Sequence, residues 1–140
     1  MKYFIKLNVF SILYAFMIFV LIQLMGNIYR ISRLTGWNID TVISLSFVVI
    51  IIVFILGTYL HFFLSKKEWM KGRKSRFWTV ILWVPYFILF VYTISSLFPI
   101  TYEGDTPNPS SGLIAILALI VFPFYILVIN SIDFTSQKKN

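Results

Sequence analysis

Six side chains in this sequence could carry acid–base or metal chemistry near neutral pH. They are one histidine and five carboxylates: His61, Asp40, Glu68, Glu103, Asp105 and Asp133. Hydrolysis within a membrane needs groups that converge, such as a serine with a histidine, two carboxylates, or a set of metal ligands. The spans derived below place Asp40, Glu103 and Asp105 on one side of the membrane and the other three groups on the opposite side. The sequence therefore predicts no catalytic residues and no metal site.

The absence of cysteine excludes a second group of chemistries. With no cysteine in the chain, disulfides, thiolate nucleophiles and iron–sulfur ligation are all removed. A single histidine cannot provide bis-histidine haem ligation within one chain, and only a homo-oligomer could pair it. We therefore expect no cofactor. For His61 itself we expect a water-exposed position at the membrane interface, and the alternative is a pH-sensing role.

One basic segment, 65–76 (SKKEWMKGRKSR), is dense in charge. It holds six cations against one anion, and its basic side chains would contact anionic headgroups at about 1 kcal/mol per residue. We expect it to determine topology with incidental lipid contact, and the alternative is a docking strip for an acidic partner. The high pI comes from charges that flank the membrane, so no nucleic-acid partner is expected. The residues assigned to lipid or partner contact are Lys66, Lys67, Trp69, Lys71, Arg73, Lys74 and Arg76.

The elements that position these residues are four apolar runs. The chain has 140 residues, of which 59% are hydrophobic and 12% charged, whereas a soluble domain averages about 45–50% and about 25%. The runs cover about 7–29, 42–64, 77–98 and 113–132, each long enough to cross a bilayer as a helix. We predict an all-α polytopic membrane protein: one transmembrane domain over 1–140, built as a bundle of four transmembrane helices.

The connections between the runs differ in charge. Loops are expected at 30–41, 65–76 and 99–112, and no carboxylate is expected at membrane depth, where a proton-coupled transporter needs one. Loop 99–112 carries Glu103 and Asp105 and no cation. We expect these two carboxylates to be solvated, and the alternative is a weak cation site.

Charge asymmetry predicts the orientation. Ten of the twelve basic residues lie in loop 65–76 or near the two termini, and only Arg30 and Arg33 lie elsewhere. Cytoplasmic loops are enriched in lysine and arginine, so we predict that loop 65–76 and both termini are cytoplasmic. The short loops fit a multi-pass protein of a bacterial cytoplasmic membrane.

The first apolar run has two different faces when drawn as a helix. One face is predicted to pack against protein, and it carries Asn8, Ser11, Ala15, Gln23, Gly26 and Arg30. The opposite face is predicted to meet lipid, and it carries Phe10, Leu13, Met17, Val20, Leu24 and Ile28. Small residues let helices approach closely, and an amide paired across helices is worth about 0.6 to 2 kcal/mol. Ser11, Ala15, Gln23 and Gly26 are therefore the candidate packing or partner face.

Two further features concern the third and fourth runs. Trp83, Tyr86 and Phe90 recur at helical spacing and are predicted to form a core stripe. Pro123 falls in the middle of the fourth run, where it should bend the helix.

Taken together, these features favour a small membrane protein that acts by interaction. With no catalytic constellation, the chain is expected to bind another membrane protein as an accessory subunit, a regulator or an immunity-type protein. The alternative is a homo-oligomeric channel or small-solute transporter, whose pore would be lined by serine, threonine, asparagine and glutamine. Its expected partners are membrane lipids and either another membrane protein or a second copy of itself.

Overall fold

The computed structural model describes residues 2–66 and 74–138, and these are helical almost throughout. No strand occurs within the described ranges. The elements in chain order are α1 (Lys2–Gly26), α2 (Ile28–Thr35), α3 (Ile39–Ser65), the 3-10 helix η2 (Lys74–Trp78), α4 (Thr79–Leu97), the 3-10 helix η3 (Glu103–Asp105) and α5 (Pro109–Lys138).

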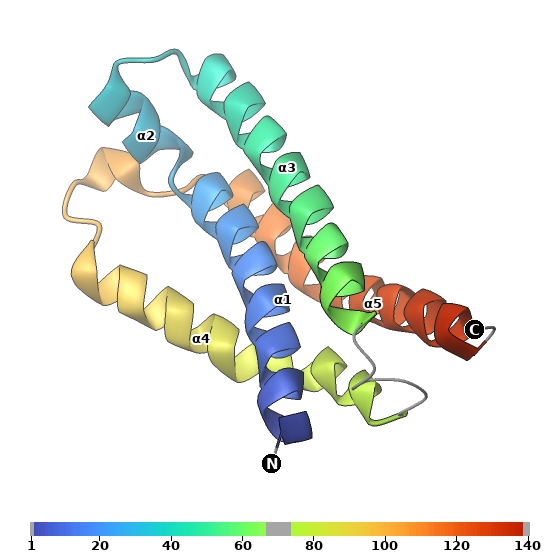
Figure 1. Cartoon of the computed structure of the whole chain (residues 1–140). Coiled ribbons are helices and arrows are strands. Elements are labelled where there is room, and N and C mark those ends of the chain that lie inside the picture. Colours follow the sequence, from blue (N-terminus) through green and yellow to red (C-terminus); the bar gives the residue numbers. More distant parts are fainter. Residues whose placement is uncertain (1, 67–73, 139–140) are drawn as a thin grey trace.

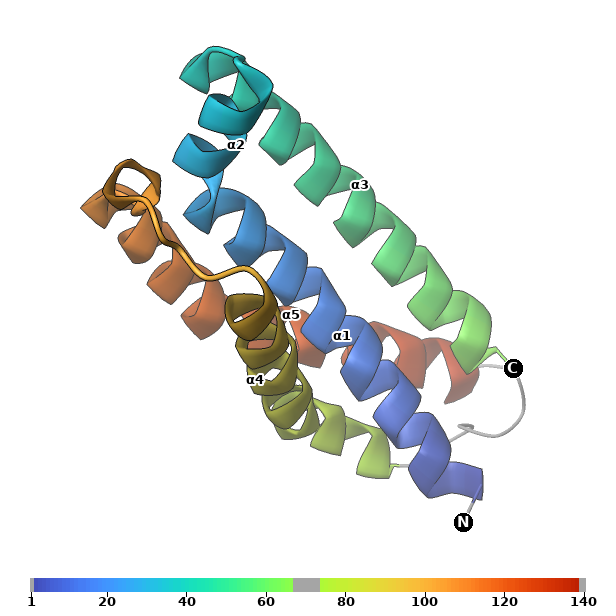
Figure 2. The same cartoon turned by 90° about the vertical axis from the view of Figure 1, so that its left-hand side faces the viewer.

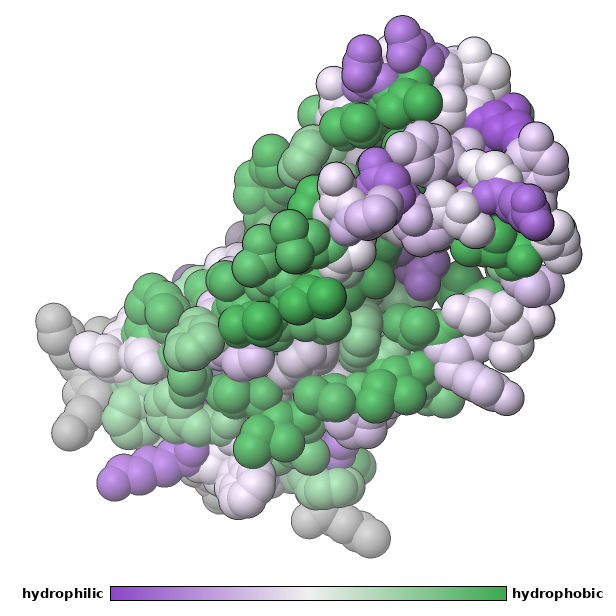
Figure 3. All heavy atoms as spheres, turned by 180° about the vertical axis from the view of Figure 1, so that it is seen from behind, coloured by the Kyte–Doolittle hydropathy of each residue, from purple (hydrophilic) through white to green (hydrophobic). Residues whose placement is uncertain are grey.

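Four stretches of helix are long and apolar enough to cross a membrane. They are Tyr3–Gly26, Ile39–Ser65, Lys74–Leu97 and Pro109–Ser136. The predicted all-α class and the four transmembrane helices are therefore confirmed, and the chain is a multi-pass membrane protein. The observed stretches start three or four residues earlier than predicted, and the fourth also ends four residues later. Figure 3 shows hydrophobic side chains along the middle of the visible face, with hydrophilic ones gathered mainly at one end.

Helix α1 lies at the centre of the bundle, with α3, α4 and α5 packed around it (Figures 1 and 2). The predicted division of α1 into a protein face and a lipid face is wrong. Ser11 and Ala15 are fully buried, but so are Phe10 and Met17 from the predicted lipid face, with 3% and 1% of their surfaces exposed. A central helix meets protein on both sides, and an apolar side chain suits a protein interior as well as it suits lipid.

The aromatic stripe of α4 contributes to this core. Trp83 is buried, and Tyr86 and Phe90 are half-buried against the same cluster as Tyr14 and Phe122. Trp83 packs edge-on against Phe122, with 5.2 Å between ring centroids. This agrees with the prediction that the stripe is core.

The two ends of the bundle hold different elements. Both termini lie at one end, which we call the terminal end, together with the end of α3 and with η2 (Figure 1). Helix α2 and η3 lie at the other end, which we call the capped end. The terminal end holds the start of α1, the ends of α3 and α5, and η2, whereas the capped end holds α2 and η3.

Helix α2 was not predicted, because 30–41 was expected to be a loop. It ends at Gly36, whose positive φ of 71° is a left-handed conformation that suits glycine. Asn38 then caps α3, because its side chain accepts a hydrogen bond from the backbone N–H of Asp40 at 3.2 Å. A glycine that ends α2 and an asparagine that begins α3 therefore separate the two helices.

Helix α5 runs through Pro123 without a break in the helix. Figure 2 shows its orange first half and its red second half running in different directions. Proline removes one backbone hydrogen bond and crowds the preceding turn, so a bend in the middle of α5 is its expected effect.

Candidate functional site

A buried cluster of polar side chains joins four elements at the terminal end. Asp133 of α5 lies at its centre, and Arg76 of η2, Ser65 and His61 of α3, and Tyr14 of α1 surround it. All five side chains are almost completely buried. Ionisable groups within a membrane are costly to bury, so such a cluster is a functional candidate by default.

The carboxylate of Asp133 receives several donors at one oxygen. The hydroxyl of Ser65 and the Nη1 group of Arg76 both donate to Oδ2, and His61 Nε2 lies 3.7 Å from the same oxygen. The guanidinium is itself completely buried and lies over the ring of Phe134 at 5.6 Å. A buried ion pair of this kind is costly to break, because removal of one partner leaves an uncompensated charge.

His61 connects this ion pair to the central helix. Its Nδ1 lies 2.9 Å from the hydroxyl of Tyr14, and its ring packs edge-on against Phe10 with 5.0 Å between centroids. When Nδ1 accepts the hydrogen of Tyr14, the hydrogen of the neutral ring is on Nε2. That nitrogen has no hydrogen-bond partner among the described residues, and it faces Asp133.

A second pair of hydrogen bonds extends the cluster toward α4. Asn130 of α5 donates to Thr79 Oγ1 at 3.0 Å, and Thr79 donates in turn to the carbonyl of Arg76 at 2.8 Å. Asn130 and Asp133 are three residues apart, and this spacing places both on one face of α5. That face therefore holds the start of α4 as well as η2.

Three expectations about this end of the molecule are wrong. His61 is not water-exposed, because only 1% of its surface is accessible. Arg76 cannot contact headgroups, because it is fully buried. A carboxylate does lie within a span, since Asp133 falls inside the stretch Pro109–Ser136 and is 4% exposed. Hydropathy places charged residues in loops, whereas here the charges pair with one another and the spans continue past them.

The other residues of the predicted basic contact segment fall into two groups. Lys66 and Lys74 are exposed, as lipid or partner contact requires. Lys67, Trp69, Lys71 and Arg73 lie outside the described residues.

A signal for the cluster was present in the sequence. His61 and Ser65 are four residues apart on one face of α3, and Asn130 and Asp133 share a face of α5. Two polar pairs at helical spacing, each near the end of an apolar run, indicate two faces that could pair.

The residue types of the cluster include those of a hydrolytic triad, but the arrangement differs. In a triad the imidazole lies between the hydroxyl and the carboxylate, whereas Ser65 donates directly to Asp133. No group of three or more histidine, cysteine or acidic side chains that could hold a metal ion occurs in the described ranges. The hydroxyl of Ser65 is therefore bonded to the carboxylate and not to the imidazole, unlike the hydroxyl of a triad.

A second candidate site is a groove at the capped end, where α4 diverges from α1 (Figure 1). It has a volume of about 700 Å³, and its walls come from the end of α1, from α2, and from the end of α4 with the following loop. Most of its lining is apolar, including Ile22, Ile94 and Phe98. The predicted partner residues Gln23 and Gly26 line it, whereas Ser11 and Ala15 are buried inside the bundle.

Polar groups line the part of this groove formed by the end of α1 and the start of α2, which we call its upper part. Asn27 donates to the side-chain oxygen of Gln23 at 3.1 Å, and Arg30 donates to the carbonyl of Phe98 at 2.9 Å. The N–H groups of the Gln23 amide make no hydrogen bond within the described part of the chain. The groove therefore presents unused donors beside apolar walls.

The capped end is held by an ion pair. Arg33 of α2 makes two hydrogen bonds to Asp105 of η3, at 2.8 and 2.7 Å, and the guanidinium lies over the ring of Tyr102 at 5.0 Å. The hydrogen bonds from Arg33 lower the pKa of Asp105 below its usual 3.8. The expectation that Asp105 is solvated is therefore wrong, because it is buried against a cation.

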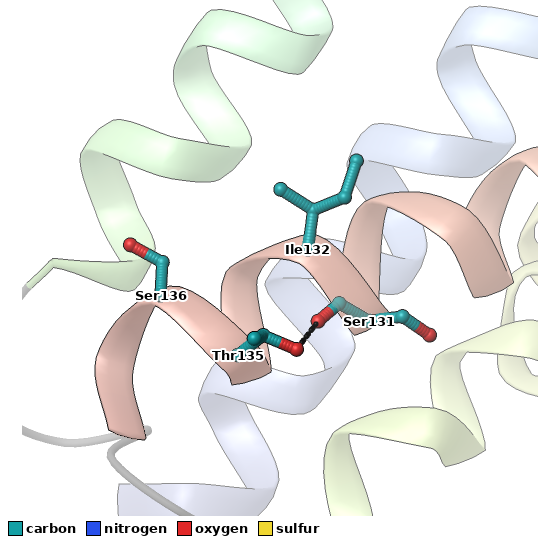
Figure 4. A pocket seen from close by; sticks show the side chains of 4 residues that line it. All are labelled: Ser131, Ile132, Thr135 and Ser136. Atoms are coloured by element: carbon teal, nitrogen blue, oxygen red, sulfur yellow. Dashed lines mark hydrogen bonds between the residues drawn. The ribbon is translucent and has the colours of Figure 1, made fainter. Parts of the chain in front are cut away.

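An open hollow on the surface of α5 is a weaker candidate (Figure 4). It has a volume of about 510 Å³ and is lined by Ser131, Ile132, Thr135 and Ser136. Thr135 donates to the carbonyl of Ser131 at 2.9 Å, and Ser131 donates to the carbonyl of Leu127 at 2.7 Å. These two hydroxyls satisfy their own helix, so they do not form a binding site.

The geometry thus leaves two candidates, the buried cluster at the terminal end and the open groove at the capped end. Comparisons with protein-family models, with curated proteins and with solved structures find no match to this chain.

Proposed function

We propose that this chain is a membrane protein without catalytic activity that works by binding another membrane protein, as an accessory subunit, a regulator or an immunity-type protein. The observation that carries the proposal is the groove between α1, α2 and α4. It displays donors of Gln23 and Arg30 among apolar side chains. An unpaired donor beside lipid is unfavourable, and a partner helix would satisfy it.

The groove favours one kind of occupant. Its polar upper part carries the positive charge of Arg30, and its apolar part continues along α1 and α4. A transmembrane helix that presents an acceptor, such as a carboxylate or a backbone carbonyl, opposite Gln23 and Arg30 matches both parts. The partner is therefore proposed to be an integral membrane protein with a polar residue near one end of a span.

The proposed orientation places both termini and the exposed Lys66 and Lys74 in the cytoplasm. This follows from the positive-inside rule and from the sequence, in which ten of the twelve basic residues lie in segment 65–76 or near the two termini. The groove would then lie in the outer half of the membrane. The proposed location is a bacterial cytoplasmic membrane, with the exposed Lys66 and Lys74 against anionic headgroups.

Photocrosslinking tests this proposal. A photoreactive residue replaces Gln23 in native membranes, and the matched control carries it at Val121, which is 60% exposed on α5 and away from the groove. We expect one foreign membrane protein to be captured from position 23 and not from position 121. The captured protein is then purified, and Gln23→Leu is expected to weaken its binding to this chain about tenfold, the effect of losing about 1.4 kcal/mol.

Two results would contradict the proposal. Equal capture from both positions would show lipid-like, unspecific contact, and self-crosslinks alone would show that the groove binds a second copy. In the second case the oligomeric alternative takes first place.

The second candidate function is a small-solute transporter or channel, and one observation favours it. Asp133 is a buried carboxylate within a span, as proton-coupled carriers require. Purified protein in liposomes with an imposed pH gradient tests this function directly. Solute or proton flux that Asp133→Asn abolishes would support transport, and absence of flux would leave the interaction proposal in place.

A further inference from the structure

The groove between α1, α2 and α4 changes character at the depth where two candidate spans end. Its apolar walls include Ile22 and Ile94, which belong to the candidate spans that end at Gly26 and Leu97. Its polar wall continues past the first span to Arg30 in α2. Span ends lie near the headgroups, because the apolar length of a span matches the hydrocarbon core of the bilayer. The groove therefore leads from headgroup level into the hydrocarbon region.

Two aromatic side chains at the capped end mark the same level. Trp37, two residues before α3 begins, is 51% exposed, and Tyr102, directly before η3, is 56% exposed. Tryptophan and tyrosine are enriched at membrane–water interfaces, where the ring meets lipid and the polar atom meets water. Arg30 of α2 lies at this same end of the bundle (Figure 1). Its charge is therefore expected at the level of the lipid phosphates.

Arg30 is the one charged side chain among the described residues that line the groove, and part of its guanidinium is unused. Nη1 donates to the carbonyl of Phe98 at 2.9 Å, and the described part of the chain provides no partner for Nε or Nη2. The amide N–H groups of Gln23 are unpaired as well. The charge of Asp105 reaches Arg30, but this carboxylate is bonded to Arg33 and does not line the groove. The groove thus offers several donors and no carboxylate.

These features match the chemistry of a phospholipid. Its phosphate accepts hydrogen bonds and carries a negative charge, and arginine binds phosphate through parallel N–H donors. An acyl chain of the same molecule would lie against Ile22 and Ile94. The volume of about 700 Å³ falls within the range of about 300–1,000 Å³ that is typical of small-ligand sites. A zwitterionic headgroup would add an ammonium group that no lining carboxylate could pair, so an anionic headgroup fits better.

We propose that the groove binds one anionic phospholipid, with its phosphate at Gln23 and Arg30 and an acyl chain between the ends of α1 and α4. Basic pockets between transmembrane helices bind anionic headgroups in this way. The inference goes beyond the proposed function, because it concerns the chain alone and needs no protein partner. The lipid covers the donors of the free chain, and a partner helix that uses the same donors would displace it.

Lipid photocrosslinking tests this site in the purified chain. The chain is placed in phosphatidylcholine vesicles with a small fraction of phosphatidylglycerol that carries a photoreactive group in an acyl chain, and mass spectrometry of peptides locates the crosslinks. Val121, 60% exposed on α5 and outside the groove, reports ordinary contact with lipid. We expect the yield at Ile22 and Ile94, divided by the yield at Val121, to be several times higher than with a phosphatidylcholine probe of the same acyl chain.

Variants of the two donors test the headgroup contacts. Arg30→Gln is expected to lower this crosslink ratio about tenfold, as for the loss of a hydrogen bond to a charged group, and Gln23→Leu is expected to lower it as well. Arg30→Lys keeps the charge and should retain part of the preference for phosphatidylglycerol. Lys74→Gln is the matched control, because it removes an exposed cation at the terminal end and should leave the ratio unchanged. The yield at Val121 shows whether each variant is folded in the vesicle.

Excess glycerol phosphate in the buffer separates a lipid from a free phosphate compound. It should leave the crosslinks in place, since it lacks the acyl chain, and their loss would assign the site to a water-soluble phosphate and overturn the proposal. Equal ratios for the two probes, or an unchanged ratio in both Arg30→Gln and Gln23→Leu, would overturn it too. So would the absence of lipid crosslinks in the groove, as when a second copy of the chain fills it. These results do not depend on a protein captured at position 23, so the two proposals fail separately.

Discussion

The ion pair between Arg76 and Asp133 explains why two candidate spans extend past charged residues. Both side chains are charged, and both are buried inside the bundle because each is paired with the other. Hydropathy treats each side chain alone, so it assigns both to the aqueous surface. The buried cluster could be predicted only in part: the helical spacing of His61 with Ser65 marks a polar face, but which face pairs with it depends on the packing.

The ion pair yields a prediction about stability. Asp133→Leu leaves Arg76 buried without its carboxylate, so we expect the free energy of unfolding to fall by about 3–5 kcal/mol. Adding Arg76→Leu should recover most of this loss, since replacing a whole buried pair by apolar groups is often close to neutral. Unfolding of the purified protein in mixed micelles with increasing denaturing detergent measures both changes.

The control for this pair is Lys66→Leu, which removes an exposed cation and should change stability by less than about 0.5 kcal/mol. Equal losses in the single and the double variant would show that the pair contributes through packing and not through charge.

At the scale of elements, the contact between α1 and α3 depends on a glycine. A Cβ added at Gly57 would lie 2.4 Å from the sulfur of Met17 and 2.9 Å from its Cγ. Small residues allow such close approach of membrane helices. Met17 is almost fully buried and has little room to move away.

Gly57→Ala is therefore expected to destabilise the bundle by about 1–3 kcal/mol, the usual cost of overpacking. Gly112→Ala is the matched control, because no atom lies within 4 Å of its added Cβ, and alanine should favour helix there by up to about 1 kcal/mol. The same detergent titration compares them. If Gly57→Ala proved as stable as the parent, the packing of Met17 against α3 would be looser than described.

At the scale of the whole molecule, the sequence predicts the number and class of the spans better than their arrangement. The length of each apolar run is set by the thickness of the hydrocarbon core, so four runs lead directly to four helices. The central place of α1 could not be predicted, because Phe10 and Met17 would be equally stable against lipid. Helix α2 was missed because a short polar helix has no long apolar run to mark it.

The orientation makes a prediction for the whole chain. Trp37 is 51% exposed at the capped end, and Lys74 is exposed at the terminal end. In intact cells a membrane-impermeant maleimide should label Trp37→Cys, and it should label Lys74→Cys only after the membrane is made permeable. The opposite pattern would reverse the proposed topology and place the groove in the inner half.

The central position of α1 has a consequence for biogenesis. Asn8 accepts a hydrogen bond from Tyr86 on α4, and the hydroxyl of Tyr14 bonds to His61 on α3. These two groups therefore find their partners only after the later helices have left the ribosome. Until then α1 is in the bilayer with the side-chain oxygen of Asn8 and the hydroxyl of Tyr14 unpaired. Membrane insertases and chaperones that shield such segments would therefore have their longest contact with α1, and the bundle would close around it from the earlier helices to the later ones.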